Sequence, residues 1–354
     1  MRPLTLSVTL LGLVVATVGL RAETHRYVPA VFYDTLSGTH PAALKIKSGD
    51  RVMTTTLDDM GMGADGKMVA EGVNPQTGPF YVEGAEPGDL LVVTIEKLEP
   101  NRDTGTSTSF VTPGAVVAGS LGKPDPRRVT WAIDKAKGVV RFDLQAAIPN
   151  VDWKTRFVSP VFELPLTPTL GSIGVAPAAD AASATTPGPF GGNLISTDIA
   201  AGAKVMLPVL QPGALLFLGH GHARQGDGNI GGAGIETSMD VEFSVEIVKK
   251  KEWPHSSVMR PSTVVGEFEQ GWPRIETDDY LMTVGSASSL QGAFQNATLE
   301  LHHWLDDDFG LSEKTVNIFV GQAMEYEIAS VVEPNFTVVA KVKKSYLPAP
   351  VPAP

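Results

Sequence analysis

Three segments of the chain share one pattern of polar and apolar positions. In each, a short alternating run reaches a turn rich in Gly, Pro or Asp, and an apolar run follows the turn. Alternation with a period of two predicts strands, and these residue types predict tight turns between them. The segments are residues 43–56, 78–96 and 204–218, with turns at 48–50, 86–89 and 211–213. We therefore expect short strands joined by tight turns, and residues 239–248 and 331–342 predict further strands.

A helical period appears toward the C-terminus. Between residues 289 and 305 apolar side chains recur every three or four positions, and the acidic run 306–308 with Gly310 predicts the end of this helix. Ser312 is suited to cap a second helix, because its hydroxyl can accept a backbone N–H of the first turn. The buried stripe of that helix is expected to be Val316, Phe319, Val320 and Ala323.

Together these elements predict a mainly β fold with a β-sandwich or barrel-like core and a small α+β C-terminal part. We expect one domain over residues 23–346, with its helices within residues 286–325. The Ala/Pro/Thr-rich stretch 176–189 is typical of a surface loop or linker. The Pro-rich tail 347–354 is expected to be extended and disordered.

The first 22 residues resemble a secretory signal peptide. Arg2 precedes an apolar run from Leu4 to Leu20, and the small Ala22 suits a cleavage site. An uncleaved transmembrane anchor is the alternative, because about 18–20 apolar residues are enough to span a bilayer. Several Thr and Ser residues dilute the run and favour cleavage. We therefore expect a mature chain that starts near Glu23, is periplasmic or secreted, and has no membrane attachment.

The composition narrows the function classes. A hydrophobic share of 43% with 19% charged residues is typical of a folded globular protein. The net charge of −11, without a basic run, argues against nucleic acid as a partner. The absence of cysteine excludes thiolate nucleophiles, disulfides and cysteine-ligated metals. Any metal ion must therefore be held by His, Asp or Glu side chains.

The segment 218–228 is the most informative for chemistry. If a strand continues through His222, the period of two places His220 and His222 on one face, with both imidazoles directed to one point. Imidazole with carboxylate is the ligand set of a catalytic zinc or similar divalent ion, and Asp227 and Glu236 are close in sequence. The alternative is that the two histidines are hydrogen-bonded structural residues. The surrounding glycines favour a ligand site, because such a backbone can pass close to a ligand.

Other carboxylates have two interpretations each. Asp58 and Asp59 end an apolar strand, where a carboxylate either caps a turn or points into a site. Glu83 and Glu236 lie in apolar strand contexts that suit a general base, although an exposed strand face explains each equally well.

The sequence motifs of several common enzyme mechanisms are absent from the chain. The chain has no Gly-x-Ser-x-Gly elbow, and its Ser-rich run 285–289 is better explained by a helix cap. Residues 226–228 lack the following glycine and helix of a phosphate loop or dinucleotide fingerprint. Serine-based hydrolysis and nucleotide binding are therefore not expected.

Several blocks of the mature chain, in order and spacing, resemble the acetamidase/formamidase family. The blocks are Gly78-Pro-Phe-Tyr-Val-Glu-Gly-Ala-Glu-Pro-Gly-Asp89, Gly191-Gly-Asn193, Leu207-Pro-Val, Gly213-Ala, His222-Ala-x-Gln-Gly-Asp-Gly228 and Ile235-Glu236. The resemblance spans residues 42–344 and implies a mainly β fold with a helical C-terminal part. It also implies hydrolysis of a small amide or cyclic amide to a carboxylic acid and ammonia, in some relatives with a metal ion.

The chain departs from the family pattern at three places. It has His220 where the family usually has Asp, Asn229 where it has Glu, and Leu194-Ile195 where it has Met-Asp. A histidine in place of an aspartate keeps the capacity to bind a metal but changes the charge of the site by one unit. We therefore expect the Lewis acidity of the metal and the preferred substrate of this chain to differ from those of the usual family member.

These observations predict an exported, metal-dependent amidohydrolase acting on a small linear amide such as formamide or acetamide. A divalent metal ion, with zinc as the leading candidate, would be held by His220, His222 and either Asp58 or Asp227. Glu236 or Glu83 would accept the proton. The expected substrate contacts are Asn193 and Gln225.

Two other hypotheses remain open at the level of sequence. The chain could be a non-catalytic, exported β protein that binds a small ligand, because two or three carboxylates of the family pattern are missing. It could also hydrolyse a lactam or an ester. A homo-oligomer is compatible with the sequence.

Overall fold

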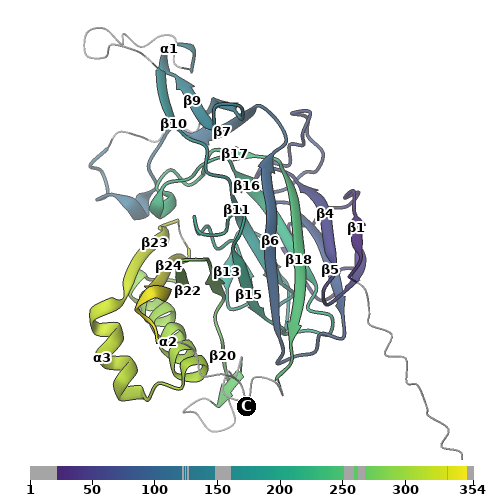
Figure 1. The fold of residues 1–354 in the computed structure, drawn as a ribbon. Coiled ribbons are helices and arrows are strands. Elements are labelled where there is room, and N and C mark those ends of the chain that lie inside the picture. The colour runs from purple at the N-terminus through teal and green to yellow at the C-terminus, as the bar shows by residue number, and fades with distance from the viewer. Residues whose placement is uncertain are drawn as a thin grey trace, which may run out of the picture.

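The computed structural model describes most of the chain. The described residues are 22–121, 123, 125, 127–147, 161–250, 259–261, 268–332 and 334–348. The predicted signal peptide, apart from Ala22, and residues 349–354 of the predicted tail lie outside them. Two large sheets form the described fold, and two helices lie near its C-terminal end (Figure 1). This confirms the mainly β fold with a small α+β C-terminal part.

The first large sheet has nine strands in the order β1-β4-β18-β6-β15-β21-β22-β24-β23. All neighbouring strands are antiparallel except β1 and β4. The strands are β1 (Thr24–Arg26), β4 (Arg51–Thr56), β6 (Leu90–Pro100), β15 (Lys204–Pro208), β18 (Met239–Val248), β21 (Arg274–Glu276), β22 (Tyr280–Ala287), β23 (Glu325–Ser330) and β24 (Phe336–Lys343).

The second large sheet has eleven strands and carries the residues of greatest chemical interest. Its main order is β10-β9-β8-β7-β17-β16-β11-β14-β13, and β5 pairs with β16 and, in parallel, with β3. The strands are β3 (Leu44–Lys47), β5 (Gln76–Glu83), β7 (Thr104–Thr108), β8 (Arg128–Asp134), β9 (Val139–Asp143), β10 (Val161–Pro165), β11 (Thr169–Val175), β13 (Pro187–Gly188), β14 (Gly191–Gly192), β16 (Leu216–His222) and β17 (Glu236–Thr237). Strands β8, β9 and β10 extend beyond the rest of the fold, with α1 (Leu144–Ala147) at their end (Figure 1).

The three predicted turns are the points where the chain crosses from one sheet to the other. β3 and β4, β5 and β6, and β15 and β16 are consecutive in sequence but belong to different sheets. The turns include Gly49, Gly88 and Gly213, with φ of 93°, 97° and 77°. These angles lie in the left-handed region that glycine adopts without a Cβ penalty. The strands were therefore predicted correctly, and the turns reverse the chain between layers.

The main hydrophobic core draws on strands of both large sheets. It includes Val52 and Val205 from the first sheet and Phe80 and Leu216 from the second, all of them fully buried. A second core lies between the nine-stranded sheet and the two helices. Alternate residues of β6 belong to different cores, since residues 91 and 93 contribute to the main core and residues 90 and 92 to the second. The period of two thus buries both faces of this strand.

The two helices were predicted correctly, with small differences at their ends. They are α2 (Leu290–Phe309) and α3 (Glu313–Ala323), and they lie against β22 and β24 (Figure 1). Ser289 and Ser312 cap them by accepting the N–H groups of Gly292 and Thr315. The acidic run 306–308 lies inside α2, which ends when Gly310 adopts φ of 60°. Within the described residues, none of the helices combines the length and apolar character that crossing a bilayer requires.

The stretch 176–189 is exposed at residues 178–181, 183 and 185 and packs into the fold at both ends and at Ala184. Ala176 and Ala184 are fully buried in a small core with Leu36 and Phe217. The stretch also contributes the short strand β12 (Ala182–Ser183), which pairs with β2 (Thr35–Leu36). A further short pair joins β19 (Met259–Pro261) to β20 (Phe268–Gln270).

Candidate active site

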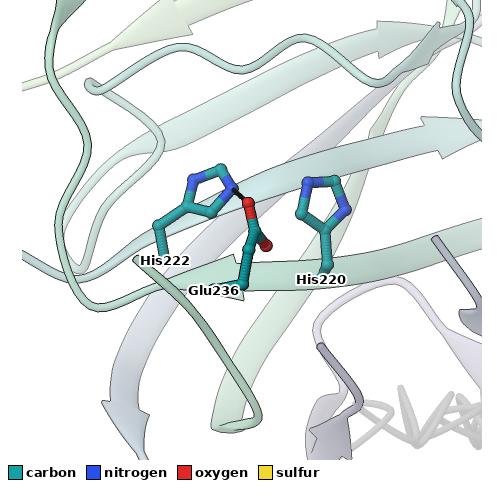
Figure 2. A group of neighbouring side chains, drawn as sticks. All are labelled: His220, His222 and Glu236. Atoms are coloured by element: carbon teal, nitrogen blue, oxygen red, sulfur yellow. Dashed lines mark ion pairs between the residues drawn. The ribbon is translucent and has the colours of Figure 1, made fainter. Parts of the chain in front are cut away.

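Three buried side chains meet where β16 pairs with β17. His220 and His222 are alternate residues of β16 and share one face of the strand. Glu236 of β17 is the direct antiparallel partner of His222, so its side chain lies on the same side of the sheet. Figure 2 shows Glu236 between the two imidazoles. The predicted histidine pair is therefore brought together, with a carboxylate from the next strand.

The ligand atoms of this triad lie close enough to hold one metal ion. One atom from each of His220, His222 and Glu236 lies within 4.8 Å of the other two. Nε2 of His222 is 3.0 Å from Oε1 of Glu236. All three residues are at most 2% exposed. Among the described residues no other group of His, Asp and Glu has this arrangement.

The triad leaves buried polar atoms without hydrogen bonds. His220 Nδ1 and Glu236 Oε2 have no hydrogen-bond partner among the described residues, and His222 Nε2 has only the ion-pair contact with Glu236 Oε1. Glu236 Oε1 accepts the backbone N–H of Gly234 at 2.9 Å. Orphaned polar atoms are rare in protein interiors, because each one carries the full cost of its desolvation. Two such atoms beside the His222–Glu236 pair fit the ligand set of a divalent cation.

Glycines make room for the histidine rings. A Cβ on Gly171 would lie 2.2 Å from Nε2 of His220, and a Cβ on Gly234 would lie 2.7 Å from Cγ of His222. Real Cβ atoms do not approach other heavy atoms this closely, so any larger residue would displace a ring. This explains part of the glycine density seen in the sequence around the histidines.

Burial sets the protonation of the triad. It lowers the pKa of His220 and of His222 to about 4, so both imidazoles are neutral near pH 7 and keep a lone pair for a metal. Burial raises the pKa of Glu236 to about 7, against the opposing effects of His220 and Arg128. The carboxyl group therefore changes charge near neutral pH.

Asp58, predicted as a metal ligand, is engaged elsewhere. Its Oδ1 accepts the N–H groups of Met60 and Met62, and its Oδ2 accepts from Arg102 at 2.6 Å. Arg102 also donates to the backbone carbonyl of Glu236 at 3.3 Å. Both charged side chains are almost fully buried. The structure thus gives Asp58 the turn-capping role that the sequence had left open, and links it to β17 through Arg102.

Asp59 has a different environment from Asp58. Arg128 at the start of β8 forms a two-pronged ion pair with its carboxylate, and Nη1 lies 2.9 Å from Oδ1. Burial, followed by the charge of Glu236, raises the pKa of Asp59 to about 7, while Arg128 opposes the rise. Asp59 is therefore a carboxylate close enough to the triad for the charge of Glu236 to affect its protonation.

Asp59 and Arg128 also line a cavity of about 340 Å³. The triad residues do not line it. Further walls come from β7, from the segment before β5, and from the connection between β23 and β24. They include Val73, Asn74, Phe110, Asn193 and Val332. Asp59 therefore lines this cavity and is also close enough to the triad for the charge of Glu236 to raise its pKa.

The remaining predicted site residues have separate positions. Asn193 lines the cavity, and Gln225 is buried with its Nε2 donating to the carbonyl of Ile195. Asp227 is exposed in a short 3₁₀ turn (Asp227–Asn229) and is not part of the triad. Glu83 is exposed at the end of β5, opposite Lys47 of β3. The structure does not bring Asp227 or Glu83 to the histidines.

The sequence interpretation did not single out two arginines of the site. Arg102 and Arg128 lie 44 and 69 positions from the carboxylates that they bind. Asn74 of the cavity wall was also not predicted, although its φ of 54° is unusual for a residue other than glycine. An arginine at the start of an apolar strand was the available hint for Arg128.

Comparisons with known sequences point to one family. The sequence model of the Acetamidase/Formamidase family matches residues 159–346. A candidate formamidase of Schizosaccharomyces pombe is 27% identical over 220 residues, covering 49% of this chain and 51% of that protein. The acetamidase of Mycolicibacterium smegmatis is 28% identical over 235 residues, covering 54% of this chain and 58% of that protein. The matched part thus spans little more than half the length of these relatives.

The structural comparison extends over most of the chain. A protein of Thermoanaerobacter tengcongensis, described as a predicted acetamidase/formamidase, has a TM-score of 0.73 and 28% sequence identity to this chain. The superposition covers 92% of this chain and 97% of that one. The likeness therefore includes N-terminal strands that lie outside residues 159–346.

Proposed function

Because the chain belongs to the acetamidase/formamidase family, we propose that it hydrolyses the carbon–nitrogen bond of a small linear amide such as formamide or acetamide. The products would be a carboxylic acid and ammonia. The observation that carries the proposal is the buried triad of His220, His222 and Glu236, which includes buried polar atoms without a hydrogen-bond partner. A purely structural cluster would be expected to satisfy these atoms internally.

We further propose that the triad holds a divalent metal ion, with zinc as the leading candidate. When bound, such an ion polarises a carbonyl oxygen and lowers the pKa of water. The neutral imidazoles of His220 and His222 supply lone pairs, and Glu236 supplies a carboxylate oxygen. Asp59 lines the cavity and changes charge near pH 7, so it suits the role of proton acceptor better than the exposed Glu83.

The proposal is tested by the metal content of the purified protein together with ammonia release. Formamide, acetamide and a cyclic amide are the substrates, each with and without a chelator. One metal ion per chain and chelator-sensitive release from the linear amides are the expected results. Metal without ammonia release from any linear amide would contradict the amidase proposal, and release that survives complete removal of metal would contradict the metal proposal.

The affinity of the triad for a divalent ion is expected to fall as the pH drops below about 7. Glu236 has a pKa of about 7 in the metal-free protein, whereas both histidines have a pKa of about 4. Between these values binding must displace one proton from Glu236 and none from the imidazoles. The affinity should therefore decrease about tenfold per pH unit below 7 and level off above it.

Competition with a chromophoric chelator, at pH values from about 5.5 to 8.5, measures this dependence. Asp59→Asn is a useful control, because it removes the neighbouring carboxyl group that also has a pKa of about 7 while leaving the triad ligands in place, so the pH dependence of metal affinity should persist in it. A flat affinity between pH about 5.5 and 7 would contradict the role given to Glu236.

We also propose that the chain is exported and that cleavage follows Ala22. The backbone nitrogen of Glu23 donates to Oδ1 of Asp50 at 2.9 Å, and Asp50 is 4% exposed. Cleavage there would convert this nitrogen to an α-ammonium group beside a buried carboxylate. Although burial acts to raise the pKa of Asp50, the N–H groups of Glu23 and Lys47 and the ring of His25 hold it below its ordinary value. The carboxylate is therefore charged at neutral pH and suited to pair with a new N-terminus.

A chain that begins at Glu23 with a free amino group is expected to be more stable than one that begins at Ala22. The charged hydrogen bond to Asp50 should add about 1–3 kcal/mol to the free energy of unfolding. Urea unfolding at neutral pH measures the difference, and Asp50→Asn should abolish it. Intact mass of the protein recovered from the periplasm or medium identifies the processed end. Equal stability of the two chains would contradict the pairing, whereas an uncleaved chain would contradict cleavage after Ala22, and absence of the protein from the periplasm and medium would contradict export.

A further inference from the structure

A residue next to β11 has a strained backbone. Ile195 has φ of 58°, in the left-handed region that a β-branched residue almost never adopts. Such a conformation costs free energy and persists only where surrounding contacts impose it. Ile195 is 3% exposed, so these contacts must come from the protein itself. The residues bonded to Ile195 therefore hold this part of the chain in place.

Hydrogen bonds hold Ile195 on both sides. Its N–H donates to the carbonyl oxygen of Gly171 at 3.0 Å, and its own carbonyl oxygen accepts Nε2 of Gln225 at 2.9 Å. Because a carbonyl oxygen can only accept, the second bond also fixes which end of the Gln225 amide faces Ile195. The other end, Oε1, has no hydrogen-bond partner among the described residues. Gln225 thus acts on the Ile195 backbone through one oriented hydrogen bond.

Gly171 connects Ile195 to the triad. The residues on either side of Gly171 pair with those on either side of His220, so the two residues lie opposite each other on β11 and β16. A Cβ on Gly171 would lie 2.2 Å from Nε2 of His220, which means that the imidazole ring packs directly against the Gly171 backbone. The residue that accepts the N–H of Ile195 is therefore the residue that supports the His220 ring.

The contacts form a closed circuit around this part of the site. Gln225 follows His222, the last residue of β16, by three positions. The circuit runs from His220 to Gly171, on to Ile195, and back through Gln225 to the chain that carries the histidines. A shift of Ile195 would reach the His220 ring through a single intervening residue.

We propose that Gln225 is a positioning residue for His220, and that it acts by holding Ile195 in the strained conformation that fixes Gly171. The inference rests on the proposed metal site, because the placement of the His220 ring matters most for a metal ligand. Residues that orient metal ligands typically change metal affinity about 10–100-fold when they are replaced. This role differs from the substrate contact expected from the sequence, in which Gln225 would act without Ile195.

The first test is a double-mutant cycle on the zinc affinity of the full mature chain. Gln225→Met removes the donor with little change in volume, and it should weaken zinc binding about tenfold or more in competition with a chromophoric chelator. In an Ile195→Gly background the same substitution should have a much smaller effect, because glycine adopts the left-handed conformation without support. An equal loss of affinity in both backgrounds would overturn the action through Ile195.

Gln211→Met is the matched control. Gln211 also donates through Nε2 to backbone carbonyls, those of Pro177 and Ala178, but it lies in the turn before β16, whereas the histidines lie at the other end of that strand. Zinc affinity should stay that of the unmodified protein. An equal loss in Gln211→Met and Gln225→Met would overturn the specific role. If Gln225→Met does not fold, Gln225→Asn takes its place, since the shorter side chain cannot reach Ile195.

The ring of His220 gives a readout that does not depend on metal. In NMR spectra of the labelled, metal-free protein, the His220 ring signals should move in Gln225→Met. They should be the same in Ile195→Gly with and without that substitution, and His220→Asn assigns them. If no zinc binds but the ring signals follow this pattern, the positioning role stands and the metal proposal fails. If zinc binds and neither affinity nor ring signals respond to Gln225→Met, the positioning role fails and the metal proposal stands.

Discussion

His222→Ala is expected to lose its metal ion and to lower kcat/KM for acetamide at least about 1000-fold. The substitution removes one of the three ligand atoms that lie within 4.8 Å of one another. Two remaining donors hold a divalent ion too weakly for occupancy at ordinary concentrations. The expected loss in rate corresponds to about 4 kcal/mol of transition-state stabilisation. Metal analysis of the purified variant and the initial rate of ammonia release are the two measurements.

The matched control is His302→Ala. His302 lies on α2 and contacts Asn317, far from the triad in the fold, so metal content and rate should remain those of the unmodified protein. Circular dichroism of both variants shows whether the fold is retained. Full activity in a folded His222→Ala protein would contradict the site. Loss of activity in both variants would indicate a general effect of histidine replacement and not a metal site.

Arg102→Met is expected to produce the largest loss of stability of the substitutions considered. It would leave Asp58 as a buried carboxylate without its cationic partner, which typically costs about 3–5 kcal/mol. Arg102 also donates to the carbonyls of Gly63, Thr104 and Glu236, so those groups would lose a donor. Urea unfolding of the mature chain measures the change in free energy.

The double variant Asp58→Asn/Arg102→Met separates the charge effect from the loss of packing. The introduced asparagine would keep an oxygen for the N–H groups of residues 60 and 62 but carry no charge, so part of the lost stability should return. Arg127→Met is the control for an exposed pair, because Arg127 binds Asp125 at the surface and should change stability by less than about 1 kcal/mol. A single Arg102→Met variant as stable as the control would show that the buried pair is unimportant.

The sequence predicted the six strands β3, β4, β5, β6, β15 and β16 because the turns between them have strong local signals. Gly49, Gly88 and Gly213 need a backbone conformation that few other residues adopt, so their positions mark the turns directly. The helix caps Ser289 and Ser312 are equally local. The pattern of polar and apolar positions could not predict the sheet to which each strand belongs, since sheet membership depends on pairing between distant segments.

Only the local geometry of the candidate site was predicted from the sequence. His220 and His222 share a face because they are two residues apart on one strand. Glu236 joins them because of its register opposite His222, which the sequence does not specify. The same limit explains Asp58 and Asp59, whose different partners are arginines from distant strands. The roles of adjacent carboxylates were therefore decided by tertiary pairing.

The pairing of β16 also determines when during folding the site can form. Its histidine-bearing end pairs with β11 on one side and β17 on the other, and the strand pairs with β5 nearer its start. These partners span residues 76–237, so their pairing with β16 closes long loops of the chain. The chain must lose the conformational entropy of these loops before the contacts between strands can stabilise it. The triad should consequently assemble late on the folding pathway. A fragment limited to residues 159–346 would lack β5, β7 and both arginines of the site, and would not be an independently folding catalytic module.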